Sequence, residues 1–530
     1  MMEMEFLNIE KKEKTFSKTF FVVLIGILQG FLAVCVSTGM LPGYFAWLQI
    51  LLALTTVIFL DPYDALLSLI ISIPFYLALP NPKFDSLSGW RIAVIFVFLG
   101  WFVKDRIWKK HLFKAEFWKD VYKRLAVWDK YILFFAVIAA VSILFEPFRI
   151  VGLKKFLFLA NAYLIYLLML VIAKNKEQVI GYIKAFCFSA MAIIALGYIQ
   201  FIATFFSSTY HFWQYWATVI SRSYYGSVLS DSLVYSNSWF SFNTGGAPSL
   251  RMFSILPDSH AFALVGVLVL APLFYLLQQT QSKSQRKIYW ASIIFTVISI
   301  GLSGTRGAWA GLVVPAIFWL YMRYKNISKK ELYIFSSAFI FFILFVVCSP
   351  FVQKIFSDFE KGHNSGNFLT RAESIYDLQE SSNKGRILIW EHTLAYDLKH
   401  PVLGSGLGNF VITLNPGSKD YNSLANANEK EFNLPGRYIT AHDLYLDVLS
   451  ETGIFGLLAF LLYFWKICKT HWQAIRTKTN PWFVYEFFIL VWIVGYSLFD
   501  GTLINDRVLL YFLVGLAISA IFLKDELNKA

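Results

Sequence analysis

The sequence is poor in charged residues and in cysteine. Only 15% of its 530 positions are Asp, Glu, Lys or Arg, against about 25% in an average soluble domain. This shortage excludes an ordinary soluble fold. The four cysteines form no CxxC pair and have no metal-ligand spacing, so neither a disulfide framework nor a zinc site is predicted. The chain also has no repeat of about 20 to 50 residues and no inverted halves, which counts against a transporter.

Apolar residues are abundant instead: 57% of the chain is hydrophobic and 18% is aromatic. A membrane span needs about 20 apolar residues, and runs of this kind recur along the whole chain. They lie near residues 20–38, 44–60, 63–80, 90–103, 130–146, 152–172, 178–205, 260–278, 287–303, 307–322, 332–349, 443–465, 482–499 and 507–523. We therefore predict an all-α polytopic membrane protein with about 14 transmembrane helices.

The net charge of +13 is explained by where the Lys and Arg residues lie along the chain. Lys and Arg lie in short segments between apolar runs and form no continuous stripe, so no nucleic-acid partner is predicted. Residues 104–130 hold nine Lys or Arg against four Asp or Glu, which places this stretch on the cytoplasmic side. We expect cytoplasmic N- and C-termini, a retained N-terminal signal-anchor and contacts between basic clusters and anionic lipids.

With this topology, residues 206–259 and 350–442 lie outside the cytoplasm. The longer stretch carries nine Lys or Arg and ten Asp or Glu, as expected of a large helical loop folded over the membrane. Its arginines therefore need another explanation than topology.

Arg306 stands in a turn of small residues, Gly301 to Gly311, between two predicted helices. A central Arg costs about 2.5–3.5 kcal/mol on insertion scales, so an Arg without a role is not expected there. The guanidinium fork suits phosphate. We predict that Arg306 binds a phosphate group; the alternative is a side chain that reaches back to lipid headgroups.

Arg386 precedes Ile387, Trp390 and Leu394, whose spacing predicts a helix with an apolar face on the membrane surface. We expect Arg386 in the first turn, where the helix dipole disfavours a cation, so an anionic partner is the preferred explanation. A solvated surface Arg is the alternative. After this helix, the glycines of residues 400–410 recur at every second position, which is typical of a tight turn and unlike a dinucleotide-binding loop.

His442 opens a predicted apolar helix at the outer face. The positive end of the helix dipole favours a neutral imidazole that can take a proton, although the adjacent Asp443 partly opposes this effect. An interfacial His without a chemical role is the alternative. Arg251 lies just before another span, after a loop rich in aromatic rings that we expect to anchor at the interface, with a few available to stack on sugars.

These segments, in this order, resemble the O-antigen ligase and O-antigen polymerase (Wzy-type) superfamily. The matching pieces are Ser303 to Trp309, Gly385 to Trp390, His400 to Phe410 and Ala441 to Gly453. The resemblance covers about residues 290 to 465. It divides the chain into an N-terminal transmembrane region (1–289), the O-antigen ligase/polymerase-like region (290–465) and C-terminal transmembrane helices (466–530).

The resemblance implies a C-type membrane glycosyltransferase in the bacterial inner membrane, with an extracytoplasmic active site. It would transfer a glycan from an undecaprenyl-diphosphate carrier to an acceptor glycan or lipid. Arg306 and Arg386, with Arg251 as a weaker match, would hold the diphosphate, and His442 would activate the acceptor hydroxyl. Asp443 stands where the family often has Asn.

No cofactor and no metal are predicted. His392 and His400 lie eight residues apart and would share a helix face only if the helix continued to Pro401. The alternative function is a lipid-linked glycan flippase. Within the enzyme class, a polymerase for O-antigen or exopolysaccharide, a ligase to the core of lipopolysaccharide and a protein O-glycosylating transferase differ only in acceptor; the number of predicted spans slightly favours a polymerase.

Overall fold

The computed structural model describes residues 2–80, 87–105, 119, 122–234, 239–241, 249–324, 333, 336–337, 340, 381–414 and 440–527. The described part is built from helices, with one pair of two-residue strands. Its longer elements are α1 (Met2–Ser37), α2 (Ala46–Phe59), α3 (Pro62–Ser72), α4 (Gly89–Lys104), α6 (Asp129–Leu144), α7 (Arg149–Ile172), α8 (Lys176–Ala203), α10 (Arg222–Val234), α11 (Ser259–Gln279), α12 (Lys283–Leu302), α14 (Val313–Tyr324), α17 (Ser381–Asp397), α20 (Leu444–Arg476), α21 (Trp482–Tyr496) and α22 (Asp506–Leu527). Shorter elements are η1 (Gly43–Phe45), η2 (Ile73–Phe75), α9 (Thr209–Tyr215), the π-helix η4 (Trp216–Ser221), β1 (Phe240–Ser241), β2 (Ser249–Leu250), α13 (Arg306–Gly311), α18 (Val411–Leu414) and η5 (Thr502–Ile504).

Among the described residues, six helices are long and apolar enough to cross a membrane. They are Phe20–Ser37, Arg149–Ile172, Lys176–Ala203, Ser259–Gln279, Leu444–Arg476 and Asp506–Lys524. The predicted all-helical membrane protein is therefore confirmed, but the count of about 14 spans is not. Several predicted spans are short as helices: α2 has 14 residues and α6 has 16, below the roughly 20 needed for a perpendicular crossing. The predicted span 332–349 lies almost wholly outside the described residues.

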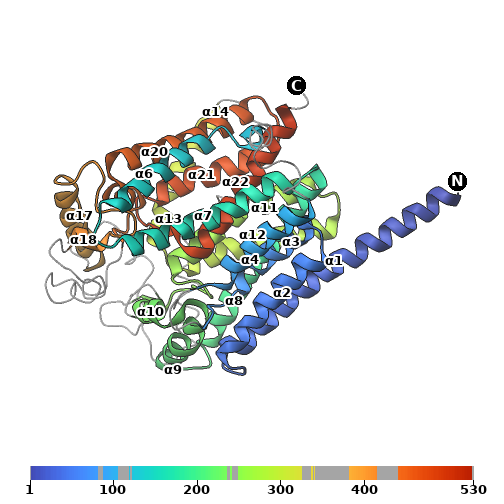
Figure 1. The fold of residues 1–530 in the computed structure, drawn as a ribbon, viewed down its shortest axis with the longest axis horizontal. Coiled ribbons are helices and arrows are strands. Elements are labelled where there is room, and N and C mark those ends of the chain that lie inside the picture. The colour runs from blue at the N-terminus through green and yellow to red at the C-terminus, as the bar shows by residue number, and fades with distance from the viewer. Residues whose placement is uncertain are drawn as a thin grey trace.

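Helices from the two predicted hydrophilic stretches lie toward the same end of the molecule (Figure 1). In this view, α9 and α10 of the first stretch and α17 and α18 of the second lie toward the left, whereas the N-terminal end of α1 lies toward the right. The expectation that both stretches lie outside the cytoplasm stays a prediction. Of the predicted loop 350–442, the structure describes residues 381–414 and 440–442.

The centre of the bundle is formed by α11, α21 and α22, whose side chains are almost all buried. Helix α11 packs against α8, α12, α21 and α22. Its N-terminus and the C-terminus of α21 lie at the same end, because the Tyr496 hydroxyl donates to the carbonyl of His260 at 3.3 Å. The core thus brings together the N-terminus of α11 and the C-terminus of α21, which both carry ionisable residues.

A glycine-rich turn, residues 401–408, joins α17 to the bundle. Gly404, Gly406 and Gly408 all have positive φ, and a side chain at Gly404 would collide with the backbone of Ser450. There α20 is interrupted by Gly453, which has φ 68°, and Ile454 N donates to the Pro401 carbonyl at 2.9 Å. The predicted tight turn is confirmed, and it docks against the break in α20.

Candidate functional site

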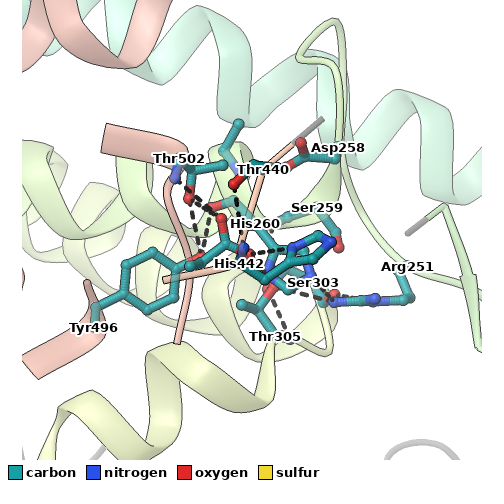
Figure 2. Close-up of polar contacts among 12 residues, drawn as sticks. Arg251, Asp258, Ser259, His260, Ser303, Thr305, Thr440, His442, Tyr496 and Thr502 are labelled. Atoms are coloured by element: carbon teal, nitrogen blue, oxygen red, sulfur yellow. Dashed lines mark hydrogen bonds and ion pairs between the residues drawn. The ribbon is translucent and has the colours of Figure 1, made fainter. Parts of the chain in front are cut away.

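Side chains from four separated parts of the chain converge at the end of the bundle that carries α17 (Figure 2). They come from the start of α11 and the segment before it, the α12–α13 turn, the segment before α20, and the end of α21 and the segment after it. The labelled members are Arg251, Asp258, Ser259, His260, Ser303, Thr305, Thr440, His442, Tyr496 and Thr502. Each lies at a helix end or in a short connection, where backbone groups are free to bind side chains.

Asp500 connects two histidines in this cluster. Its Oδ2 lies 2.8 Å from Nδ1 of His260 and 3.8 Å from Nδ1 of His442. Its Oδ1 accepts hydrogen bonds from the backbone N and the hydroxyl of Thr502, at 3.0 and 2.8 Å. Burial alone would raise the pKa of Asp500, but the two histidines hold it well below its usual range. A carboxylate therefore stays ionised between two imidazoles.

The two histidines differ in how far their side chains are exposed to solvent. The His260 side chain is 13% exposed and that of His442 is 33% exposed. His442 also has a φ of 53°, a left-handed conformation that costs a residue with a Cβ about 1–2 kcal/mol. A strained, accessible imidazole beside a buried carboxylate is the arrangement expected of a proton acceptor.

Arg251 is buried within the same cluster. Its Nε donates to the Ser303 carbonyl at 3.0 Å, and its Nη2 donates to the Thr305 hydroxyl at 3.4 Å. The same Nη2 lies 3.4 Å from Nε2 of His260. Arg251, the weaker match in the sequence, is thus the arginine in closest described contact with the histidine pair.

Arg306 and Arg386 approach the cluster from two other helices. Arg306 is the first residue of α13 and directly follows Thr305, which accepts from Arg251. Arg386 is half-buried on α17, and its charge acts on both His260 and Tyr496. All three predicted arginines therefore lie at the same end as His442.

One expectation about the α17 region is wrong, and the condition for a shared face of His392 and His400 is not met. Arg386 lies in the second turn of α17, which begins at Ser381. The helix dipole is therefore not a reason for Arg386 to bind an anion. The helix also ends at Asp397, so His392 and His400 do not share a continuous helix face. The His400 ring instead stacks on Tyr396, with ring centroids 4.2 Å apart.

Asp443 has a structural role that the sequence did not reveal. Its carboxylate caps α20 by accepting from Leu446 N at 2.9 Å, and burial raises its pKa. The carboxylate placed against His442 is that of Asp500, which lies far away in the sequence.

An apolar groove of about 290 Å³ runs between α17 and α20 beside this cluster. It is lined by Trp390, Leu394, Asp443, Tyr445, Leu446, Leu449 and Leu457. Trp390 donates from Nε1 to the Ala441 carbonyl at 2.8 Å, which ties the groove wall to the residue before His442. Below the groove, Leu458 and Trp465 of α20 are exposed, as expected of a surface that faces lipid.

Residues 290–461 match the O-antigen ligase family model. The match covers about a third of the chain and confirms the resemblance predicted from the motifs. No curated protein matches the chain. The matched region contains Arg306, Arg386 and His442, and it supports a function in surface-polysaccharide synthesis.

Several members of the cluster lie outside the O-antigen ligase region. Arg251, His260 and Asp500 flank it on both sides, so the site joins this region to the rest of the chain. The sequence analysis did not single out His260 or Asp500. Both residues are ionisable and lie at the ends of almost wholly apolar helices. This feature of the sequence could have identified them as candidates for a functional site. The domain boundaries at 289 and 465 stay predictions.

Proposed function

We propose that this protein is a glycosyltransferase that moves a glycan from an undecaprenyl-diphosphate carrier to an acceptor sugar, outside the bacterial cytoplasmic membrane. The observation that carries the proposal is the contact of Asp500 with both His260 and His442, at the end of the bundle where three arginines gather. An anion-binding group and a proton acceptor in one place are what this reaction requires.

The arginines would hold the diphosphate of the donor. As the bond between the anomeric carbon and the phosphate oxygen breaks, negative charge grows on the leaving diphosphate. Guanidinium groups stabilise this charge through bidentate, charge-assisted hydrogen bonds. Arg306 and Arg386, which lie in the matched O-antigen ligase region, are the main candidates for direct contact. Arg251 donates to Ser303 and Thr305.

The groove between α17 and α20 would receive the first part of the carrier's isoprenoid chain. Its wall is apolar, and it begins next to His442 through Asp443. Arg386 and Trp390 lie four residues apart, one turn of α17, which places the diphosphate contact and the groove wall on the same side of the helix. A lipid-linked donor fits this combination better than a soluble sugar does.

His442 would take the proton of the acceptor hydroxyl. The hydroxyl oxygen then bonds to the anomeric carbon as the diphosphate leaves, and direct displacement inverts that carbon. Asp500 would stabilise the imidazolium that forms. A positioned general base contributes about 10²- to 10⁴-fold to a rate. His260, more buried than His442, would orient Asp500 without touching the acceptor.

The test uses purified protein in liposomes with lipid-linked repeat units, and follows chain length on a gel. We expect new glycosidic bonds with the wild type and strongly reduced transfer with Arg306→Ala and His442→Ala. Matched controls are Arg286→Ala, at an exposed position of α12, and His211→Ala, at an exposed position of α9; both should transfer normally.

The products distinguish the possible reactions. A ladder indicates a polymerase, and a single transfer to added core lipid or protein indicates a ligase. Movement of the lipid-linked glycan across the bilayer without new bonds would indicate a flippase and overturn the proposal.

A further inference from the structure

A buried carboxylate lies directly behind the turn that carries His442. Asp447, in the first turn of α20, is 4% exposed. Its Oδ2 accepts from the Thr440 hydroxyl and its Oδ1 accepts from Ala441 N, both at 2.6 Å. The Thr440 hydroxyl oxygen in turn accepts from His442 N at 3.2 Å. The left-handed turn at His442 is therefore held by a chain of hydrogen bonds that ends on Asp447.

The same carboxylate also contacts the segment that carries Asp500. A Cβ added at Gly501 would lie 2.4 Å from Oδ2 of Asp447, so a side chain at this position would displace the Asp447 carboxylate. One turn away, Leu444 N donates to the Ser497 carbonyl at 2.9 Å. Asp447 thus lies between the two loops whose side chains meet in the candidate site.

A partly buried ion pair lies close to Asp447. Lys155 of α7 reaches both carboxylate oxygens of Glu451, at 2.7 and 2.6 Å. Glu451 lies one turn after Asp447 on α20, and the charges of Lys155 and Glu451 both act on Asp447. Two buried carboxylates one turn apart repel each other, and the ammonium group of Lys155 offsets this repulsion.

We propose that Asp447 is a positioning residue, which fixes the His442 and Asp500 loops relative to each other, and that the Lys155–Glu451 pair keeps it in place. The role in transfer rests on the proposed function; the effect on the His442 turn does not. Asp447 acts through His442 and does not touch the substrate. Its loss should therefore lower kcat and leave the KM for the lipid-linked donor nearly unchanged.

The first measurement needs no activity. Hydrogen exchange of the full-length protein in nanodiscs should show faster exchange at Ala441 and His442 in Asp447→Ala than in the wild type. Asp447→Asn should lie between the two, because its amide oxygen can still accept from Ala441 N. Unchanged exchange in Asp447→Ala would overturn the inference, whatever the protein's activity.

The second measurement is transfer kinetics in the assay above. Asp447→Ala should lower kcat about 10- to 100-fold, the range expected when hydrogen bonds to a charged group are lost, with partial recovery in Asp447→Asn. In a His442→Ala background it should cause no further loss. An equal, additive loss in that background would show a merely structural role and overturn the inference.

The third measurement reverses the ion pair. Lys155→Glu and Glu451→Lys should each reduce kcat, and the double exchange should restore part of it; no restoration would contradict the role of the pair.

Asp129→Asn is the matched control for the Asp447 variants, because Asp129 is equally buried and accepts hydrogen bonds from Tyr163 and Tyr166. It should lower stability without changing kcat. If the wild type makes no glycosidic bond but hydrogen exchange responds as expected, the proposed function fails and the positioning role remains.

Discussion

The two ends of α20 each carry a histidine, and their surroundings are opposite. His471, near the C-terminal end, is fully buried. Its Nδ1 lies 2.9 Å from the Ile467 carbonyl and its Nε2 lies 3.0 Å from the Ser519 hydroxyl. His442, just before the N-terminal end, is a third exposed, has a left-handed backbone and faces a carboxylate.

This difference separates a histidine that stabilises the fold from one that is suited to chemistry. Both ring nitrogens of His471 are occupied by uncharged groups, and its ring packs on Trp128 and Phe483. A proton gained there would have to be buried without a charged partner. At His442 a proton would face Asp500, 3.8 Å away. Burial alone therefore does not identify the functional residue, but the charge of its neighbours does.

The largest effect is expected at His442. His442→Gln should lower the transfer rate about 10²- to 10⁴-fold, because the general base is lost. The measurement is initial rate against lipid-linked donor at saturating acceptor, with the amount of folded protein determined by gel filtration. A variant that keeps more than half of the wild-type rate would remove His442 from the mechanism.

A smaller loss of activity is expected when the charge between the histidines is removed. Asp500→Asn keeps the shape of the side chain and its contacts with Thr502 but gives no counter-charge to an imidazolium. We expect a fall in kcat of about 10- to 100-fold, as for the loss of a charged hydrogen-bond partner. Thr502→Ser, which keeps the hydroxyl, serves as the control and should retain activity.

The reverse pattern is expected at the other end of α20. His471→Leu removes two buried hydrogen bonds and should lower the free energy of unfolding by about 1–3 kcal/mol, because the Ser519 hydroxyl and the Ile467 carbonyl lose a partner. Its transfer rate per folded molecule should equal that of the wild type. A variant that is stable but inactive would show that the comparison between the two histidines is misleading.

The smallest effect concerns two buried carboxyl groups with opposite pKa shifts. Burial raises the pKa of Asp397 from 3.8 to about 7, and within the described residues neither of its oxygens has a hydrogen-bond partner. A raised pKa in the folded state means that stability is lost as pH rises through that range. Asp397→Asn should therefore flatten the decline of Tm between about pH 4 and 7.

Asp500 should behave in the opposite way. Its pKa is held below the usual value, so its contribution is present above the unfolded pKa and is lost as pH falls through the folded one. Asp500→Asn should reduce the loss of Tm on acidification and leave the range above pH 4 nearly unchanged. If both variants shift Tm equally at every pH, the charges of the two groups do not matter to stability.

Much of the helical fold follows from hydropathy, because apolar runs and helices coincide over most of the described chain. The number of crossings does not, because short helices such as α2 have the composition of a span but not its length. The helix after Gly385 and the turn at Gly404 were also predictable, from apolar spacing and from glycines at alternate positions.

The sequence led to four of the residues near the site, Arg251, Arg306, Arg386 and His442, through motifs that lie mostly in the O-antigen ligase region. It did not lead to His260, Asp500 or Asp447. Their roles depend on contacts between positions that are distant in sequence, such as His442 with Asp500. No local pattern predicts which helix ends meet, because that is decided by how α11, α20 and α21 pack.

The position of Asp500 after α21 has a consequence for biosynthesis. A ribosome completes the arginine motifs and the His442 turn before it makes the segment that joins the two histidines. A nascent chain already inserted up to α20 would lack the counter-charge that orders the centre. On the proposed function, transfer would thus begin only once the segment after α21 has been made and Asp500 lies against His442.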